Sequence, residues 1–481
     1  MPMQSLPERP QDLQAWLDRA ERALNAGRWT EARELLLPAA QWLPRVPQIQ
    51  HHLGAAHLAL GQAQLALESA QRALALAPAQ WQSQLLLGRA HKALGQMEAA
   101  DASFDAVLKL QPGQGEALVA KADLAMNIFG LPLQAIALVQ PLLNQSQHAV
   151  DAELTTLMAS LYDRDMSATE LTQRVMAFSK QYMRLSQLQL PPLAPRRAAK
   201  ARPRVGIISP LFCNSPVYFL TIAGWQHVAR GSDIVVFNRG YKSDWASAAF
   251  RALSPQWLDV QALSAEALAR SIHAQDLDVL YDLGGWMDPV ALKALSAKPA
   301  RAMYKWVGGQ SMTTGLESFD GWIGDPWQSP LHLQHLYSEP LVNIPEGYAT
   351  YTPPSYLPAL TPWARRSRTP VVFSNPAKLS RAFMAYLRQM TGPVCFVHQQ
   401  FQYARTRAKV EAALDGSKAR AEFVCPTSHR QALEILGGFR TMVDTFPYSS
   451  GLTAREAQAM GLHVKVFTGE LFCERHSLHL G

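Results

Sequence analysis

One loop near the C-terminal end of the chain combines residue types that suit an anionic ligand. Residues 441–443 form an apolar run that predicts a buried strand, and the small residues 449–451 follow it as a loop. A helix is expected to begin near Thr453, with Glu456 in its first turn. Small residues let backbone N–H groups approach a ligand, and a helix N-terminus attracts anions. With Glu456 accepting hydrogen bonds from sugar hydroxyls, the segment suits a nucleotide-sugar diphosphate.

The same residues have a second interpretation that needs no ligand. Thr453-Ala-Arg-Glu456 also fits a capping box, in which the two end side chains bond to each other's backbone N–H groups. At the level of this segment alone, both interpretations stay open.

Length and composition indicate a folded protein of several domains. The chain has 481 residues, too many for one core, so two or three domains are expected. A hydrophobic content of 48% and a charged content of 17% exclude a disordered chain. The net charge of +7 includes two basic clusters in expected linkers, but neither lies in a nucleic-acid-reading motif, so no nucleic-acid partner is expected. The clusters are Arg196, Arg197, Lys200, Arg202 and Arg204, then Arg365, Arg366 and Arg368.

Cysteine spacing and hydropathy exclude further classes. The four cysteines are far apart, which argues against a disulfide framework and against a structural zinc site. The N-terminus lacks the apolar stretch of a signal peptide. The most apolar window, residues 205–225, is interrupted by Pro210, Asn214 and Pro216, so no membrane span is expected. A cytoplasmic location is the resulting expectation.

Residues 10–150 repeat with a period of 34 residues. This is the tetratricopeptide pattern, in which small residues stand where two helices cross and a proline closes each unit. A fourth unit, about 115–147, fits only with one inserted residue. Such arrays bind a protein segment in their groove, although capping the rest of the chain or forming a homodimer through the repeats stays open. The agreeing positions are Leu53, Gly54, His57, Ala66, Ala70, Ala73 and Pro78, then Leu87, Gly88, His91, Ala100, Phe104, Val107 and Pro112.

The remainder predicts a helical connector and two α/β domains. Residues 151–190 keep a helical pattern, and a segment rich in proline and arginine follows. Residues 203–355 and 368–481 then alternate strand and helix, which predicts two Rossmann-like domains with a ligand cleft between them. There is no GxGxxG or GxxxxGK[ST] motif. The expected strands are 204–209, 233–238, 278–283, 302–307, 321–323, 371–374, 394–398, 422–425, 441–443 and 464–467.

Several motifs together carry a resemblance to a known family. The segment beginning Tyr162-Asp-Arg-Asp lies in the connector, and Trp306-Val-Gly and Thr313-Thr-Gly-Leu-Glu lie in the first α/β domain. Asn375-Pro-Ala-Lys-Leu-Ser and Asp444-Thr-Phe-Pro-Tyr lie in the second. In this order and spacing, the motifs resemble those of the O-GlcNAc transferase/SPINDLY family of glycosyltransferases.

The resemblance implies both architecture and chemistry. The family joins a tetratricopeptide solenoid to a GT-B region of two Rossmann-like domains. It transfers a sugar with inversion from a nucleotide diphosphate to Ser or Thr of a protein, without a metal. Here the implied donor is UDP-GlcNAc, no cofactor is expected, and Lys378 becomes the catalytic, diphosphate-binding lysine. The implied nucleotide-sugar site is Asn375, Lys378, His429, Ser450, Gly451, Thr453 and Glu456.

Two of these residues also have ordinary explanations. Lys378 fits an exposed lysine at a helix start, where a cation is mildly unfavourable. His429 fits a solvated histidine in a loop.

Departures from the family pattern favour an inactive relative. Ser215 replaces a histidine of the first catalytic loop, and Leu452 replaces a threonine of the phosphate loop. Met287 ends an altered turn, and a carboxylate sometimes proposed as the base aligns with Gln275, next to Asp276. The second Rossmann-like domain is also expected to lack its C-terminal helices. The sequence therefore leaves two hypotheses: a protein O-glycosyltransferase, or a catalytically inactive relative that binds partners through its repeats.

Overall fold

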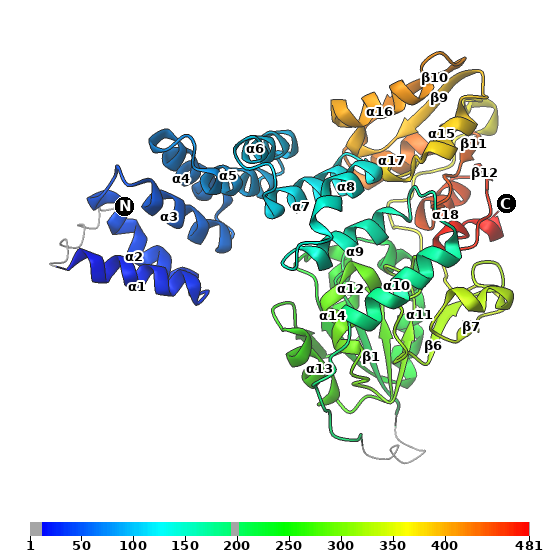
Figure 1. The fold of residues 1–481 in the computed structure, drawn as a ribbon. Coiled ribbons are helices and arrows are strands. Elements are labelled where there is room, and N and C mark those ends of the chain that lie inside the picture. Colours follow the sequence, from blue (N-terminus) through cyan, green and yellow to red (C-terminus); the bar gives the residue numbers. More distant parts are fainter. Residues whose placement is uncertain (1–11, 194–201, 481) are drawn as a thin grey trace. The chain divides into compact units, whose positions relative to one another are not determined.

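A computed structural model describes residues 12–193 and 202–480 of the chain (Figure 1). The chain divides into two compact units, Met1–Thr156 and Leu157–Gly481. Arg196, Arg197 and Lys200 of the first basic cluster lie outside the described residues, as do the first two residues of the predicted repeat region.

The first unit consists of antiparallel helix pairs whose close packing requires small residues. A Cβ on Gly88 would lie 2.5 Å from the ring of Phe104, and one on Gly54 would lie 2.8 Å from Leu86. Ala66, Ala70 and their counterparts in the repeat are fully buried. The predicted helical repeats are therefore present. The helices are α1 (Leu13–Asn25), α2 (Trp29–Trp42), α3 (Pro47–Ala59), α4 (Ala63–Leu76), α5 (Trp81–Ala93), α6 (Met97–Leu110), α7 (Gly115–Asp123) and α8 (Pro132–Val139).

A π-helical turn accounts for the residue inserted in the fourth repeat. The helix α7 continues directly into the π-helical segment η1 (Leu124–Ile128). A π-bulge adds one residue to a helix without breaking it. The repeat therefore keeps its packing positions, and Ala122, Ala125 and Ala135 stay in the core of this unit.

Two helices form the connector between the repeats and the α/β region. These are α9 (Ala149–Ala159), within which the boundary between the two units falls, and α10 (Ala168–Tyr182). Ser167 caps α10 by accepting a hydrogen bond from the backbone N–H of Glu170.

The second unit contains two parallel sheets (Figure 1). The first has seven strands in the order β3-β2-β1-β4-β5-β6-β7, with α11 to α14 between its strands. The elements are β1 (Arg204–Ser209), α11 (Pro216–Gly231), β2 (Asp233–Asn238), α12 (Trp245–Arg251), β3 (Gln256–Asp259), α13 (Ala265–His273), β4 (Val279–Asp282), α14 (Pro289–Leu295), β5 (Ala302–Lys305), β6 (Gly321–Gly324) and β7 (Leu341–Asn343).

The second sheet has five strands in the order β10-β9-β8-β11-β12. Its faces are covered by apolar side chains, which pack against the flanking helices and include Val371, Val397 and Met442. The elements are β8 (Val371–Val372), the 3-10 turn η6 (Pro376–Lys378), α15 (Arg381–Leu387), β9 (Gly392–Val397), α16 (Ala404–Leu414), β10 (Ala419–Val424), α17 (His429–Leu436), β11 (Thr441–Val443), α18 (Leu452–Ala459) and β12 (His463–Lys465).

The structure corrects several details predicted from the sequence. All ten expected strands are present, but β3 and β7 were missed because these edge strands are short and partly polar. The helix α18 begins at Leu452, so Glu456 is its fifth residue and the capping-box interpretation of Thr453-Ala-Arg-Glu456 is wrong. Two cluster arginines are not in solvated linkers, since Arg204 opens β1 and buried Arg366 donates to the carbonyls of Met460 and Gly461.

Candidate functional site

The strand order of the second sheet places two candidate loops side by side. The central strand β8 pairs with β9 on one side and with β11 on the other, and all of these pairs are parallel. The chain order therefore reverses between β8 and β11, which makes this a topological switch point. The segment 375–378 leaves the carboxyl end of β8, and 444–451 leaves that of β11. Ligands of open α/β sheets bind at such points.

Lys378 lies in the turn after β8 and points at the neighbouring loop. Its Nζ donates a hydrogen bond of 2.8 Å to the carbonyl of Ser449 and lies 4.4 Å from the centre of the Tyr448 ring. Asn375 shapes the turn, because its side chain accepts a hydrogen bond from Ala377 N–H. Burial lowers the pKa of Lys378 to about 8, although the nearby Asp444 carboxylate acts in the opposite direction. The interpretation as an exposed surface lysine is therefore wrong.

The loop after β11 is held by a buried carboxylate and by hydroxyl groups. Asp444 accepts hydrogen bonds from the N–H groups of Thr445 and Ser450 and from the hydroxyl of Ser477. The Ser450 hydroxyl lies 2.9 Å from that of Ser374, which follows β8. These contacts anchor the loop where Gly451 leads into the first turn of α18.

Glu456 of α18 and His429 of α17 form a hydrogen-bonded pair. Glu456 is 1% exposed, and its Oε1 accepts a 2.7 Å hydrogen bond from His429 Nε2. The Tyr356 hydroxyl lies 2.8 Å from His429 Nδ1. A carboxylate can only accept, so Nε2 carries the proton in the contact with Glu456. His429 is the first residue of α17, and both of its ring nitrogens lie within hydrogen-bond distance of a partner. The interpretation of His429 as a solvated histidine in a loop is therefore wrong.

Six of the seven predicted residues therefore fall into two groups around α18. Lys378, Asn375, Ser450 and Gly451 gather at the N-terminal side of the helix, and His429 and Glu456 are paired farther along it. Thr453 is the second residue of α18 and is partly buried in its first turn.

Two histidines near Lys378 were missed by the sequence analysis. Burial and the Lys378 charge lower the pKa of His398 to about 4, and His398 directly follows β9. His476 lies 3.0 Å through Nδ1 from Gln328 Oε1, and burial lowers its pKa to about 3. Both imidazoles are neutral near pH 7. A polar residue at the end of a predicted strand was the available signal for His398, whereas nothing local marked His476.

Loops of the first sheet also reach this region. Ser311 follows β5, and its hydroxyl lies 2.8 Å from the Tyr448 hydroxyl. The preceding Gly308 has φ +62°, and a Cβ there would approach the carbonyl of Leu283 to 2.0 Å. The loop that contains Gly308 is therefore tightly packed, and glycine is required at this position. Ser215 donates its hydroxyl to the Leu211 carbonyl.

The alternative acid and base candidates lie elsewhere. Asp276 precedes β4, so it is at the amino edge of the first sheet, and its carboxylate pairs with Arg301 at 2.6 Å. Gln275 accepts a hydrogen bond from Arg204. Both residues are thus at the edge of the sheet opposite to the loops of the candidate site.

Within residues 12–193 and 202–480, no group of three or more His, Cys, Asp and Glu residues is arranged to hold a metal ion. No helix there is long and apolar enough to cross a membrane.

Comparisons with known proteins agree with this architecture. A tetratricopeptide-repeat family model matches residues 82–114. The chain is 24% identical over 287 residues to a probable UDP-N-acetylglucosamine–peptide N-acetylglucosaminyltransferase SPINDLY of Arabidopsis thaliana. That alignment covers 56% of this chain and 31% of the relative. A second Arabidopsis protein of this kind, SEC, is 27% identical over 157 residues, which are 32% of this chain and 16% of that protein. The chain thus spans about a third or less of these relatives.

A solved structure matches nearly the whole chain. A mutant form of the Thermobaculum terrenum O-GlcNAc transferase aligns with a TM-score of 0.61 and 22% identity. The alignment covers 96% of this chain and 84% of that one, and it shows the GT-B fold together with the repeats. The shared fold and the distant relatives thus confirm the resemblance: this chain is similar to O-GlcNAc transferase/SPINDLY glycosyltransferases, with tetratricopeptide repeats followed by a GT-B region.

Proposed function

We propose that the chain is a protein O-glycosyltransferase that transfers a sugar with inversion from a nucleoside diphosphate to a Ser or Thr hydroxyl. By analogy with the curated relatives, the sugar is GlcNAc and the donor is UDP-GlcNAc. One observation carries the proposal: the Lys378 ammonium meets the Ser449–Gly451 loop at the switch point, directly before α18. A cation and free helix-end N–H groups at one point suit a pyrophosphate.

The proposed chemistry uses these groups on the leaving diphosphate. As the acceptor hydroxyl attacks the anomeric carbon, negative charge grows on the pyrophosphate oxygen that leaves. Lys378 and the N–H groups at the start of α18 stabilise this charge, which is the largest contribution expected from such a site. Glu456, oriented by His429, accepts hydrogen bonds from the ribose hydroxyls.

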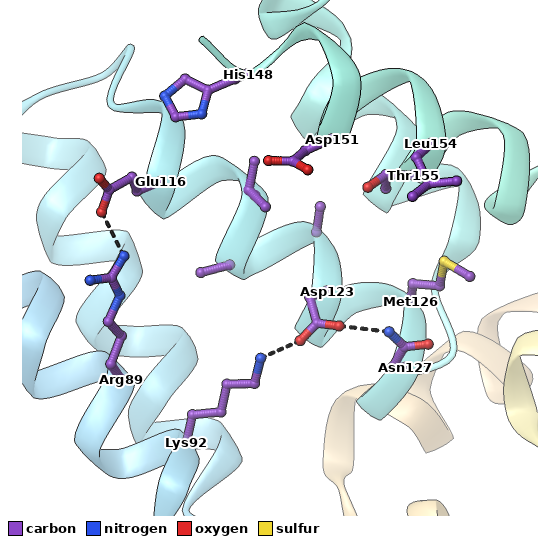
Figure 2. Close-up of a pocket in the computed structure, with 13 residues that line it drawn as sticks. Arg89, Lys92, Glu116, Asp123, Met126, Asn127, His148, Asp151, Leu154 and Thr155 are labelled. Carbon is purple, nitrogen blue, oxygen red and sulfur yellow. Dashed lines mark hydrogen bonds and ion pairs between the residues drawn. The ribbon is translucent and has the colours of Figure 1, made fainter. Parts of the chain in front are cut away.

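A groove in the first unit is proposed to hold a segment of the acceptor protein. It encloses about 550 Å³ between α5, α7 and α9. Figure 2 shows Arg89 and Lys92 of α5 paired with Glu116 and Asp123 of α7. The exposed Asp151 carboxylate has no ion-pair partner among the described residues, so the groove suits a segment with a basic side chain. Asp151→Asn should then weaken binding of a lysine-containing acceptor peptide more than of its glutamine counterpart.

The second candidate is an inactive relative that only binds partners. It is favoured by Ser215, whose hydroxyl is used within its own loop, and by Leu452, which brings an apolar side chain to the first position of α18. Neither side chain can act as a base near pH 7.

Two experiments separate the candidates. UDP or GDP should raise the melting temperature, and Lys378→Ala should abolish the rise, whereas Lys418→Ala, at an exposed lysine, should not. No shift with any nucleoside diphosphate would remove the nucleotide site. Incubation with labelled nucleotide sugars and cell lysate then tests transfer, and binding without labelled protein would favour the inactive relative.

A further inference from the structure

Four consecutive residues of the connector contact the second α/β domain beside the candidate site. They are Tyr162, Asp163, Arg164 and Asp165, which lie between α9 and α10. The motif marked the resemblance in the sequence, but the proposed chemistry assigns it no task.

Tyr162 supports the ring that contacts Lys378. The rings of Tyr162 and Tyr448 are stacked, with centroids 5.0 Å apart and planes 12° from parallel. The Tyr448 side chain also contacts the Lys378 ammonium, which lies 4.4 Å from its ring centre, and the Ser311 hydroxyl, which lies 2.8 Å from its own hydroxyl. The connector, the first sheet and the lysine thus meet at one aromatic side chain.

Asp163 binds the chain just after the turn that carries Lys378 (η6). Its carboxylate accepts hydrogen bonds from Arg381 N–H at 2.9 Å and from Arg381 Nε at 3.1 Å. Arg381 opens α15, three residues after Lys378. The connector is therefore hydrogen-bonded to the chain where η6 leads into α15.

Arg164 anchors residues 470–474, which hydrogen-bond to the loop that follows β11. Its guanidinium lies 2.5 Å from Glu474, and both side chains are largely buried. Glu474 also accepts from the N–H groups of Glu470 and Leu471. The adjacent Cys473 carbonyl accepts hydrogen bonds from both the N–H and the hydroxyl of Ser449. The Ser449 carbonyl in turn accepts the hydrogen bond from Lys378 Nζ.

We propose that Tyr162 is a positioning residue for the pyrophosphate site, which acts through Tyr448 to aim the Lys378 ammonium at the loop before α18. A lysine has a flexible four-carbon stem, so a directed cation requires a fixed neighbour. The Tyr448 ring is that neighbour, and the stack with Tyr162 prevents it from turning away. The inference rests on the proposed nucleotide site and adds the connector to it.

The test separates positioning of the lysine from general support of the domain. Dissociation constants of UDP and uridine, or of GDP and guanosine if the wild type prefers guanine, are measured by calorimetry and by ligand-observed NMR. Tyr162→Ala and Tyr162→Leu should weaken the diphosphate about tenfold, the scale of a lost cation–π contact, and leave the nucleoside within about twofold. Tyr162→Phe keeps the stack and should behave as the wild type.

A matched control lies in the same segment. Asp165 pairs with Arg381 but is 88% exposed, so Asp165→Asn should leave both ligands unaffected. Equal weakening of UDP and uridine in Tyr162→Leu, or no change in UDP affinity, would overturn the inference. Circular dichroism and the melting temperature check that each variant is folded. If the wild type binds no nucleoside diphosphate, the proposed function itself fails, and that result is distinct from the failure of the Tyr162 variants.

Discussion

The affinity for a nucleoside diphosphate should fall as the pH rises above about 8. The perturbed group is Lys378, whose pKa burial lowers to about 8 in the protein without ligand. Only the protonated amine attracts the pyrophosphate, and the bound anion holds the proton on the amine. The lysine is therefore charged and competent near pH 7 and progressively neutral above pH 8 in the free protein.

The size of the effect follows from this pKa. One unit above its pKa, about one lysine in eleven remains protonated, so the apparent dissociation constant at pH 9 should be about tenfold that at pH 7. This corresponds to about 1.4 kcal/mol of binding free energy. The terminal phosphate group loses its second proton near pH 6, so its charge is constant over this range.

The assay is calorimetric titration with UDP, or GDP, at four pH values from 7 to 9.5 and constant ionic strength. Lys378→Met should bind more weakly and without this slope. Burial also lowers the pKa of Lys409 to about 8, and its amine donates to the Pro376 carbonyl on the same turn. Lys409→Met is therefore the matched control and should keep the slope. A flat wild-type profile, or a slope that survives in Lys378→Met, would refute the reasoning.

Three predictions concern stability without ligand. Because the pKa of Lys378 is lowered from 10.5 to about 8 in the folded protein, the unfolded state binds more protons between about pH 8 and 10.5, and the buried charge lowers the free energy of unfolding near pH 7. Urea unfolding should therefore show that Lys378→Met is more stable than the wild type near pH 7 by about 1–2 kcal/mol. This gain should disappear as the pH rises from about 8 to 10.5. Gly308→Ala should cost about 2 kcal/mol or more, because a Cβ would collide with the Leu283 carbonyl; an unchanged melting temperature would contradict that geometry. Arg164→Ala should cost about 3–5 kcal/mol because it leaves buried Glu474 unpaired, and combining it with Glu474→Gln should recover part of the loss.

Local patterns in the sequence predicted the elements well. The 34-residue period predicted where helices cross, because a residue such as Gly88 is required wherever a ring such as that of Phe104 lies against the backbone. The apolar runs predicted ten strands, because interior parallel strands are buried on both faces. The edge strands β3 and β7 lack this signal. The start of α18 was predicted to within one residue, but Thr453 and Glu456 imitate a capping box that is absent, since Gly451 is the residue before the helix.

The candidate site could be predicted from the sequence only in part. The sequence by itself determined which side chains are present: a lysine after one strand, small residues after another, and a glutamate within a helix. Only the tertiary structure decided that β8 and β11 are neighbours, that Lys378 reaches Ser449, and that His429 holds Glu456. The physical reason is that spacing along the chain reports periodicity within one element, whereas contacts between residues of different elements, such as Lys378 and Ser449, depend on the order in which strands pair.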